Sequence, residues 1–242
     1  MQKSESVADG EYWEKHWRHT DICASSDNHP ICRWLDGQIC PGEGLSCFEI
    51  GCYPGKFLVL LGSKGYELNG IDLSEKTATM ADWLTSKGFK IGSLEKGDFL
   101  VNKPDKQYNL VCSFGFIEHF NNWHEMVDKQ LAMTAIDGFC VIEVPNLNSS
   151  LYRILYGIFE PDILKSHKSN AMSLKNITNY INELKYDIKT ADYVGNFYFR
   201  FVTKSGWKYR FIEKVINGFG TFFNILPRSV SARYIGVIAK VN

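Results

Sequence analysis

The 242-residue sequence lacks the features that would place it in a membrane-spanning, secreted or nucleic-acid-binding class. No apolar run approaches the roughly 20 residues needed to cross a membrane. The polar, charged first 17 residues lack the apolar centre of a signal peptide. The formal net charge is zero, so no overall field attracts nucleic acid. We therefore expect a cytoplasmic protein with no nucleic-acid partner.

Cysteine pairs are also missing. The seven cysteines form no CxxC motif, and several lie in apolar runs where cysteine usually serves as a small buried hydrophobe. Three others lie near His29 and could be read as a metal cluster: Cys23, Cys32 and Cys40. Their spacing fits no zinc pattern. We therefore expect reduced thiols and no metal.

A glycine turn joins an apolar run to a helical run in the stretch CFEIGCYPGKFLVLL. Such a turn presents N–H groups to a ligand. The loop GxxxxGK[ST] is excluded because only three residues separate Gly51 from Gly55 and Phe57 replaces the magnesium-binding hydroxyl. The motif GxGxxG is excluded because Tyr53 replaces its second glycine. With Glu49 before it, the turn suits a small zwitterion such as the methionine end of S-adenosylmethionine (SAM).

Acids follow the next two strand-like runs. The run YELNGIDLS ends at Asp72, about 20 residues past the glycine turn, where a doubly wound fold presents an acid to ribose hydroxyls. The run FKIGSLEKGDFL ends at Asp98 and Phe99. An acid followed by an aromatic side chain at a strand end can hold an adenine amine and cover its ring. The alternatives are that Asp72 serves as a helix-terminal acid, Asp98 as a turn residue and Phe99 as part of the core.

Two further buried runs complete the pattern. The run YNLVCSFGFIEHF predicts a strand from Tyr108 to Ser113, a turn at Gly115 and a helix from about Glu118. The run GFCVIEVPN predicts a fifth strand that stops at Pro145.

In order, the blocks FEIGCYPG, GIDLS, KGDF, YNLVCSFGFIEHF and DGFCVIEVPN resemble the class I SAM-dependent methyltransferase family. They are most similar to its small-molecule branch of ubiquinone-type, natural-product and polysaccharide enzymes. The resemblance implies an α/β, Rossmann-like, doubly wound seven-stranded sheet with an antiparallel last strand. It also implies SAM as cofactor and S-adenosylhomocysteine as product. One globular domain would comprise a helical cap (1–46), a SAM-binding core (47–146) and a substrate lid or insertion with the last helix and strands six and seven (147–242).

The resemblance also assigns residues to the cofactor. The loop at the methionine end would comprise Glu49, Gly51, Cys52 and Gly55, and Asp72 would bind the ribose. The adenine would contact Leu73, Asp98 and Phe99, and the backbone of Ser113 would approach the methionine end. By analogy an N-terminal helix covers the pocket, where Tyr12 or Trp17 would touch SAM; an aromatic stripe is also common in plain packing. Two residues depart from the family pattern, since Tyr53 replaces a glycine and Asn109 an acid.

Two histidines are candidates for removing a proton from a hydroxyl acceptor. His119 follows the fourth strand, where the acceptor would lie, and the ordinary pKa of histidine suits this step. Related enzymes often carry a histidine in the place of His167, before the penultimate helix. The alternatives are that His119 orients the loop and that His167 lies in a solvated loop. Glu118 is either a partner of His119 or a helix-terminal acid.

A basic, aromatic segment occupies residues 200–233, with seven Lys or Arg residues against Glu213 alone. It could be a solvated insertion, a surface that contacts a phosphate-bearing acceptor, or a weak peripheral membrane attachment.

The sequence thus predicts methyl transfer from SAM to a small-molecule or glycan acceptor, at oxygen. Alternatives are an inactive SAM-binding partner module and an N-methyltransferase of an amino sugar or amine. DNA-base methylation is disfavoured because no [DN]PP[YFW] motif follows the fourth strand.

Overall fold

The computed structural model describes residues 20–23, 28–101 and 106–242. Within them, seven strands form one sheet in the order β3-β2-β1-β4-β5-β7-β6. The strands are β1 (Ser46–Ile50), β2 (Glu67–Asp72), β3 (Ile91–Lys96), β4 (Tyr108–Phe114), β5 (Thr134–Pro145), β6 (Asp187–Val194) and β7 (Tyr234–Lys240). Strands β1 to β5 pair in parallel, whereas β7 runs antiparallel to both β5 and β6. The expected doubly wound sheet with its antiparallel last strand is confirmed.

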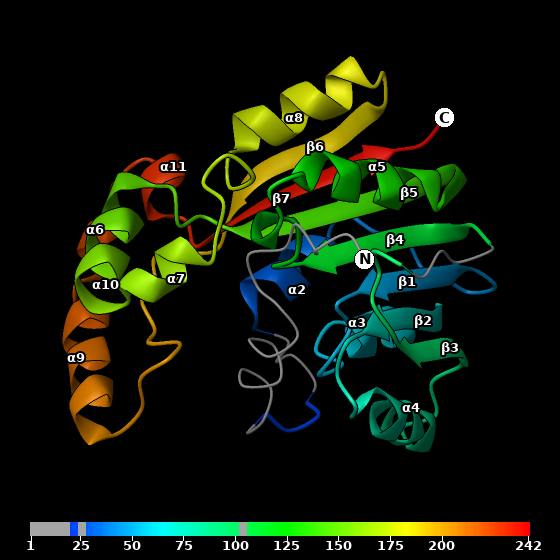
Figure 1. Ribbon diagram of the computed structural model, residues 1–242, viewed down its shortest axis with the longest axis horizontal. Helices are drawn as coiled ribbons and strands as arrows, with labels where there is room; N and C mark the ends of the chain where they lie inside the picture. The colour runs from blue at the N-terminus through cyan, green and yellow to red at the C-terminus, as the bar shows by residue number, and fades with distance from the viewer. Residues whose placement is uncertain (1–19, 24–27, 102–105) are drawn as a thin grey trace.

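Helices cover both faces of the sheet, as Figure 1 shows. The helices with their bounds are α2 (Pro30–Asp36), α3 (Leu58–Ser63), α4 (Thr77–Ser86), α5 (Trp123–Ala132), α6 (Ser150–Phe159), α7 (Pro161–Lys165), α8 (Leu174–Glu183), α9 (Trp207–Gly218), α10 (Gly220–Phe223) and α11 (Arg228–Ser231). Apolar residues of α2, α3 and α4 form one core cluster, and those of α5 and α8 belong to another. No helix among the described residues is long and apolar enough to cross a membrane.

Successive residues of the central strands pack into the hydrophobic cores on opposite faces of the sheet. Phe48 and Ile50 of β1 pack with α5, whereas Cys47 packs with α3 and α4. Side chains of a strand alternate between its faces, so a strand buried on both sides is apolar throughout. This explains why the strands were readable as continuous apolar runs.

The helices α6, α7, α9, α10 and α11 gather at one end of the molecule, at the left in Figure 1. We call this group, with the extended segment 197–203, the lobe. It lies beyond the carboxyl ends of β4 and β5, where ligands bind in open α/β sheets. The lobe therefore faces the part of the sheet in which a site is expected.

The segment after β4 differs from the sequence expectation. Instead of a helix from about Glu118, a short 3₁₀ helix covers Ile117–His119, and α5 begins at Trp123. Ile117, Glu118 and His119 are all buried. The chain thus turns inward at the carboxyl end of β4 before the helix starts, and this turn brings two ionisable side chains to the site.

Candidate active site

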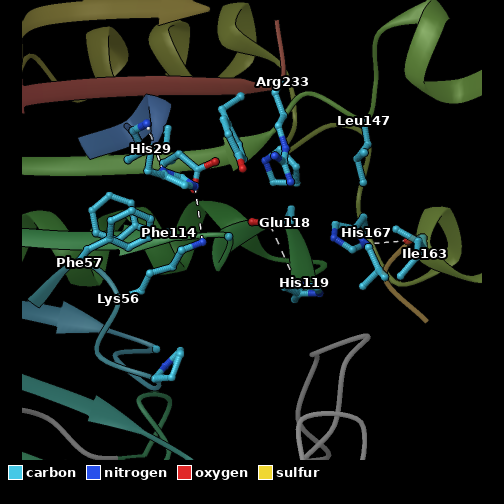
Figure 2. Close-up of a pocket in the computed structure, with 18 of the residues that line it drawn as sticks. His29, Lys56, Phe57, Phe114, Glu118, His119, Leu147, Ile163, His167 and Arg233 are labelled. Carbon is cyan, nitrogen blue, oxygen red and sulfur yellow. Dashed lines mark hydrogen bonds and ion pairs between the residues drawn. The ribbon is translucent and has the colours of Figure 1, made fainter. Parts of the chain in front are cut away.

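A cavity of about 300 Å³ lies between the carboxyl ends of β1, β4 and β5 and the lobe. The glycine turn supplies Gly51 and Cys52, while β5 supplies Glu143. The lobe supplies Tyr152 and Tyr156 of α6. Figure 2 shows side chains from both sides of this cavity.

The glycine turn adopts a conformation that requires glycine. Gly51 and Gly55 have φ of +71° and +87°, a region that other residues avoid. The N–H groups of Gly51 and Cys52 donate to the carbonyl of Ile71, so the turn is fastened to β2. A Cβ on Gly55 would lie 3.0 Å from the sulfur of Met80. Gly51 and Cys52 line the cavity, whereas Gly55 shapes the turn from behind.

Glu49 lies at the end of β1 with its carboxylate beside the cavity. Its side chain is buried, and Oε2 has no hydrogen-bond partner among the described residues. Burial raises the pKa of Glu49 well above its usual range, and the charge of Asp72 adds to the shift. A buried carboxylate oxygen without a partner is costly and favours a ligand that brings a donor.

Asp72 lies at the end of β2 and fixes the glycine turn. Its Oδ2 accepts from the N–H of Tyr53 at 3.0 Å, and its Oδ1 accepts from the N–H of Ser74 at 2.8 Å. Burial raises its pKa, while these two hydrogen bonds oppose the shift. A carboxylate has about four acceptor sites, so each oxygen retains one for a hydroxyl group. Asp72 is not among the residues that line the cavity.

Of the other residues predicted to bind SAM, five that the structure describes lie outside the cavity lining: Gly55, Leu73, Asp98, Phe99 and Ser113. Leu73 is 40% exposed. Asp98 follows β3 and accepts from the N–H of Leu100, and the buried ring of Phe99 meets Phe116 edge-on at 5.8 Å between ring centres. Ser113 of β4 is buried and donates to Gln130. Tyr12 and Trp17 lie outside the described residues.

Two histidines and a glutamate meet at the cavity (Figure 2). Nδ1 of His119 lies 2.9 Å from the carbonyl of Ser166, and Nδ1 of His167 lies 2.6 Å from that of Ile163. Because a carbonyl only accepts, each Nδ1 carries a proton, and Nε2 is the basic nitrogen of either neutral ring. The ring centres are 4.5 Å apart.

Glu118 stands beside this pair. Its carboxylate is buried, and neither oxygen has a hydrogen-bond partner among the described residues. Burial raises its pKa well above the usual range, with a contribution from Glu143. One oxygen lies 3.9 Å from Nε2 of His119.

Glu118, His119 and His167 offer ligand atoms within 4.8 Å of one another, a set that could hold a divalent cation. The 3.9 Å separation of Nε2 and the carboxylate is wider than the roughly 3.0–3.4 Å between adjacent ligands of a zinc-sized ion. The three groups would have to move together to bind one.

Two cations, Lys56 and Arg233, also line the cavity. Lys56 extends from the glycine turn to Nε2 of His29, at 3.5 Å (Figure 2). Arg233 lies over the rings of Tyr198 and Tyr234, at 4.8 and 5.0 Å. Neither cation forms an ion pair within the described ranges.

These two cations act on the titration of their neighbours. Burial lowers the pKa of His29 to about 4, and repulsion by Lys56 and Arg233 adds to the shift, so the ring is neutral. Burial also lowers the pKa of Lys56. Glu143 is buried in the cavity wall, and burial raises its pKa to about 8 although both cations oppose the shift.

The cavity brings together five of the residues predicted from sequence: Glu49, Gly51, Cys52, His119 and His167. Sequence reasoning missed Lys56 and Glu143, and it named Arg233 only as part of the basic segment 200–233. Glu143 carried a usable signal, since it is the one charged residue in the apolar run GFCVIEVPN. Lys56 carried none, because only the fold brings the glycine turn next to the start of β7.

The residues at the glycine turn fit the methionine end of SAM. The unpartnered Oε2 of Glu49 can accept from an ammonium group, and the positive φ of Gly51 lets a ligand approach the backbone closely. Among the described residues no side chain closes over Gly51, which is exposed and whose nearest neighbour for a Cβ, Phe116, is 3.9 Å away.

Comparison with known proteins gives the same picture. A family model described as a methyltransferase domain matches residues 26–213. A search of curated proteins found no match to this chain. A SAM-dependent methyltransferase from Archaeoglobus fulgidus has a similar structure, with 23% identity, a TM-score of 0.55, and coverage of 87% of this chain and 92% of that one.

Two further solved structures are similar in fold. Magnesium protoporphyrin IX methyltransferase from Synechocystis, crystallised with S-adenosylhomocysteine, has 14% identity and a TM-score of 0.56, covering 88% of this chain and 80% of that one. A putative sarcosine dimethylglycine methyltransferase from Galdieria sulphuraria has 12% identity and a TM-score of 0.58, covering 96% and 97%. At such identities the likeness concerns the fold.

Proposed function

Because this chain belongs to the methyltransferase-domain family and is a SAM-dependent methyltransferase, we propose that it methylates an oxygen of a small-molecule or glycan acceptor that carries an anionic group. SAM, when bound, supplies a methyl group on a sulfonium that an acceptor oxygen can displace in line. The protein then has three tasks, which are to hold the cofactor, to orient the acceptor and to remove a proton.

The cofactor would bind at the turn between β1 and α3. Glu49 and the backbone at Gly51 would hold the methionine end, and Asp72 would bind the ribose hydroxyls through its remaining acceptor sites. Leu73, Asp98 and Phe99 would contact the adenine, as the sequence resemblance implies.

The observation that carries the acceptor class is the pair Lys56 and Arg233, two cations that line the cavity without an ion-pair partner within the described parts of the chain. Desolvated cations of like sign repel each other, and an anion between them relieves the repulsion. A phosphate or carboxylate group fits both, since a guanidinium binds such groups through two parallel hydrogen bonds.

The proton would be taken by Nε2 of His119 or His167. Both rings are oriented by a backbone carbonyl on Nδ1, which fixes Nε2 as the proton acceptor. An oxygen of Glu118 lies 3.9 Å from Nε2 of His119, and once ionised this carboxylate would stabilise the imidazolium that forms. This is the arrangement expected of a general base and the group that supports it.

A specific observation favours a second candidate, methyl transfer to an amine. Glu118 is buried with both oxygens unpartnered, and an ammonium or amine would supply the missing donors. An amine acceptor would be methylated at nitrogen, so the position of the new methyl group in the product separates the two candidates.

The test is a transfer assay with labelled SAM and a panel of hydroxylated and amino compounds, each with and without a phosphate or carboxylate group. We expect turnover of anionic hydroxyl compounds, with KM raised at least about tenfold in Lys56→Gln and Arg233→Gln and unchanged in Lys175→Gln, an exposed lysine of α8. Preference for uncharged acceptors would contradict the proposal. SAM binding without any methylated product would favour the inactive partner module.

A further inference from the structure

Large apolar side chains cover the outer surface of α9, α10 and the turn that follows them. Six of them are between 47% and 83% exposed, and we call them the apolar face: Trp207, Phe211, Val215, Phe219, Phe222 and Ile225. In α9 three of these residues recur every fourth position, so they form one stripe along the helix. A contiguous exposed apolar surface of this kind marks an interaction site.

The outward orientation of this stripe is fixed by polar contacts on the opposite side of the helix. Glu213 accepts from the N–H of Phe201, and Asn217 both accepts from the N–H of Phe199 and donates to its carbonyl. Asn224 accepts from the N–H of Phe197. These side chains serve as the hydrogen-bond partners of an extended segment that no strand pairs. The helix therefore cannot turn its apolar face inward without leaving that backbone unpartnered.

Within the segment that carries the apolar face, the exposed charges have one sign. The exposed charged residues of segment 200–228 are Arg200, Lys204, Lys208, Arg210, Lys214 and Arg228. The one acid of the segment, Glu213, points inward to the N–H of Phe201. A protein with no net charge thus carries a locally cationic surface interleaved with exposed aromatic rings.

We propose that the apolar face docks on an anionic membrane surface. A helix with aromatic and aliphatic residues on one face and flanking Lys and Arg lies in the plane of the lipid headgroups. With 12 residues, α9 is far shorter than the roughly 20 needed to span a bilayer. A second copy of the chain is a poorer occupant, because a two-fold contact through this face would bring the same cations against each other.

Docking through this face would bring the proposed acceptor end of the cavity near the lipid. Tyr198 and Val202 line the cavity, while Phe197, Phe199 and Phe201 of the same segment pack in the core beneath the lobe helices. Segment 197–203 thus lines the cavity on one side and packs against the lobe helices on the other. A helix layer about 10 Å thick lies between this segment and the apolar face. The docking does not depend on the acceptor chemistry and can be tested without it.

The test is flotation of the full chain with vesicles of phosphatidylcholine alone or mixed with phosphatidylglycerol. We expect binding to the anionic vesicles at low salt, weakened at least about tenfold at 0.5 M salt. Trp207→Ser with Phe211→Ser, and separately Lys208→Glu with Lys214→Glu, should each lower binding at least about tenfold. The matched controls, Val101→Ser with Ile136→Ser and Lys175→Glu with Lys185→Glu, change equally exposed residues elsewhere and should leave binding unchanged.

Three results would overturn the proposal. The first is no flotation with anionic vesicles. The second is equal binding to neutral vesicles that the lysine variants leave intact. The third is a concentration-dependent dimer, seen by analytical ultracentrifugation without vesicle binding and abolished by Trp207→Ser with Phe211→Ser, which would assign the face to a second copy. Since the variants alter exposed side chains, the unfolding temperature serves to verify that each one is folded.

Discussion

Glu143 lies at the end of β5, buried in a cavity wall that also carries two cations, and its titration is tied to folding. In the unfolded chain its carboxyl ionises near pH 4.5, whereas burial raises the folded pKa to about 8. Between these values the folded protein holds a proton that the unfolded chain releases. Stability is therefore greatest below pH 4.5 for this group, falls as the pH rises and levels off above about pH 8.

Replacing the carboxyl of Glu143 should remove this dependence of stability on pH. Glu143→Gln should match the parent protein at pH 5 and exceed it progressively up to pH 8, by an amount on the order of a few kcal/mol. Urea unfolding at pH 5, 6.5 and 8 measures this difference. The control is Glu183→Gln, which changes an exposed glutamate of α8. A difference that stays constant with pH would show that burial does not hold the proton on Glu143.

The two histidines of the cavity give the second prediction at this scale. His119→Ala and His167→Ala should each lower kcat at least about tenfold while SAM affinity, measured by calorimetry, stays unchanged. Each ring touches the acceptor end, away from the glycine turn, so the two quantities should separate. Unchanged turnover in both variants would remove histidine from the chemistry.

The turnover assay also decides whether Glu118, His119 and His167 together hold a metal ion. A chelator should leave turnover unchanged, because the three groups are spaced more widely than the ligands of a zinc-sized ion. Loss of turnover with a chelator, and its recovery with one divalent cation, would instead make these residues metal ligands.

At the scale of elements, the turn from β1 into α3 combines backbone strain with close packing. Gly55→Ala would place a Cβ 3.0 Å from the sulfur of Met80 at a φ of +87°. We expect a loss of about 1–2 kcal/mol in the free energy of unfolding and weaker SAM binding. The control is Gly218→Ala, where the added Cβ meets nothing within 4 Å. Equal effects of the two substitutions would show that the turn tolerates side chains.

The strands could be predicted from the sequence, whereas the elements between them were less accessible. Burial on both faces makes β1, β4 and β5 continuous apolar runs, which a reader of the sequence can find directly. The segment at Glu118 was expected to be helical, but Phe116 and Ile117 turn into the core first. Whether the stripe of α9 faces the core or the solvent does not follow from periodicity, because the pattern is the same either way.

Residues predicted for both halves of the site line the cavity: Glu49, Gly51 and Cys52 for the cofactor, and His119 and His167 for the acceptor. Glu49 and Gly51 are two positions apart in the chain, and the spacing to Asp72 follows from one strand–helix–strand unit. Lys56 and Arg233 meet only because β7 inserts beside β5. Such a contact depends on the complete topology.

At the scale of the whole molecule, cofactor binding should stabilise the fold. SAM at about one hundred times its dissociation constant adds about 2.7 kcal/mol, which for a chain of this size corresponds to roughly 5–10 °C in Tm. Differential scanning fluorimetry measures the shift, and NAD provides the negative control. Asp72→Lys should abolish the shift, because it places a cation at the predicted ribose site and removes the acceptor of Tyr53 and Ser74. A full shift in this variant would place the sugar elsewhere.

The position of β7 has a consequence for how the chain is made. This strand pairs with β5 on one side and β6 on the other, yet it follows both in the sequence. Until Tyr234–Lys240 have left the ribosome, β5 has an open edge and β6 has no neighbour in the sheet. Nascent chains paused before this segment would therefore be prone to edge-to-edge association and would be natural clients for chaperones.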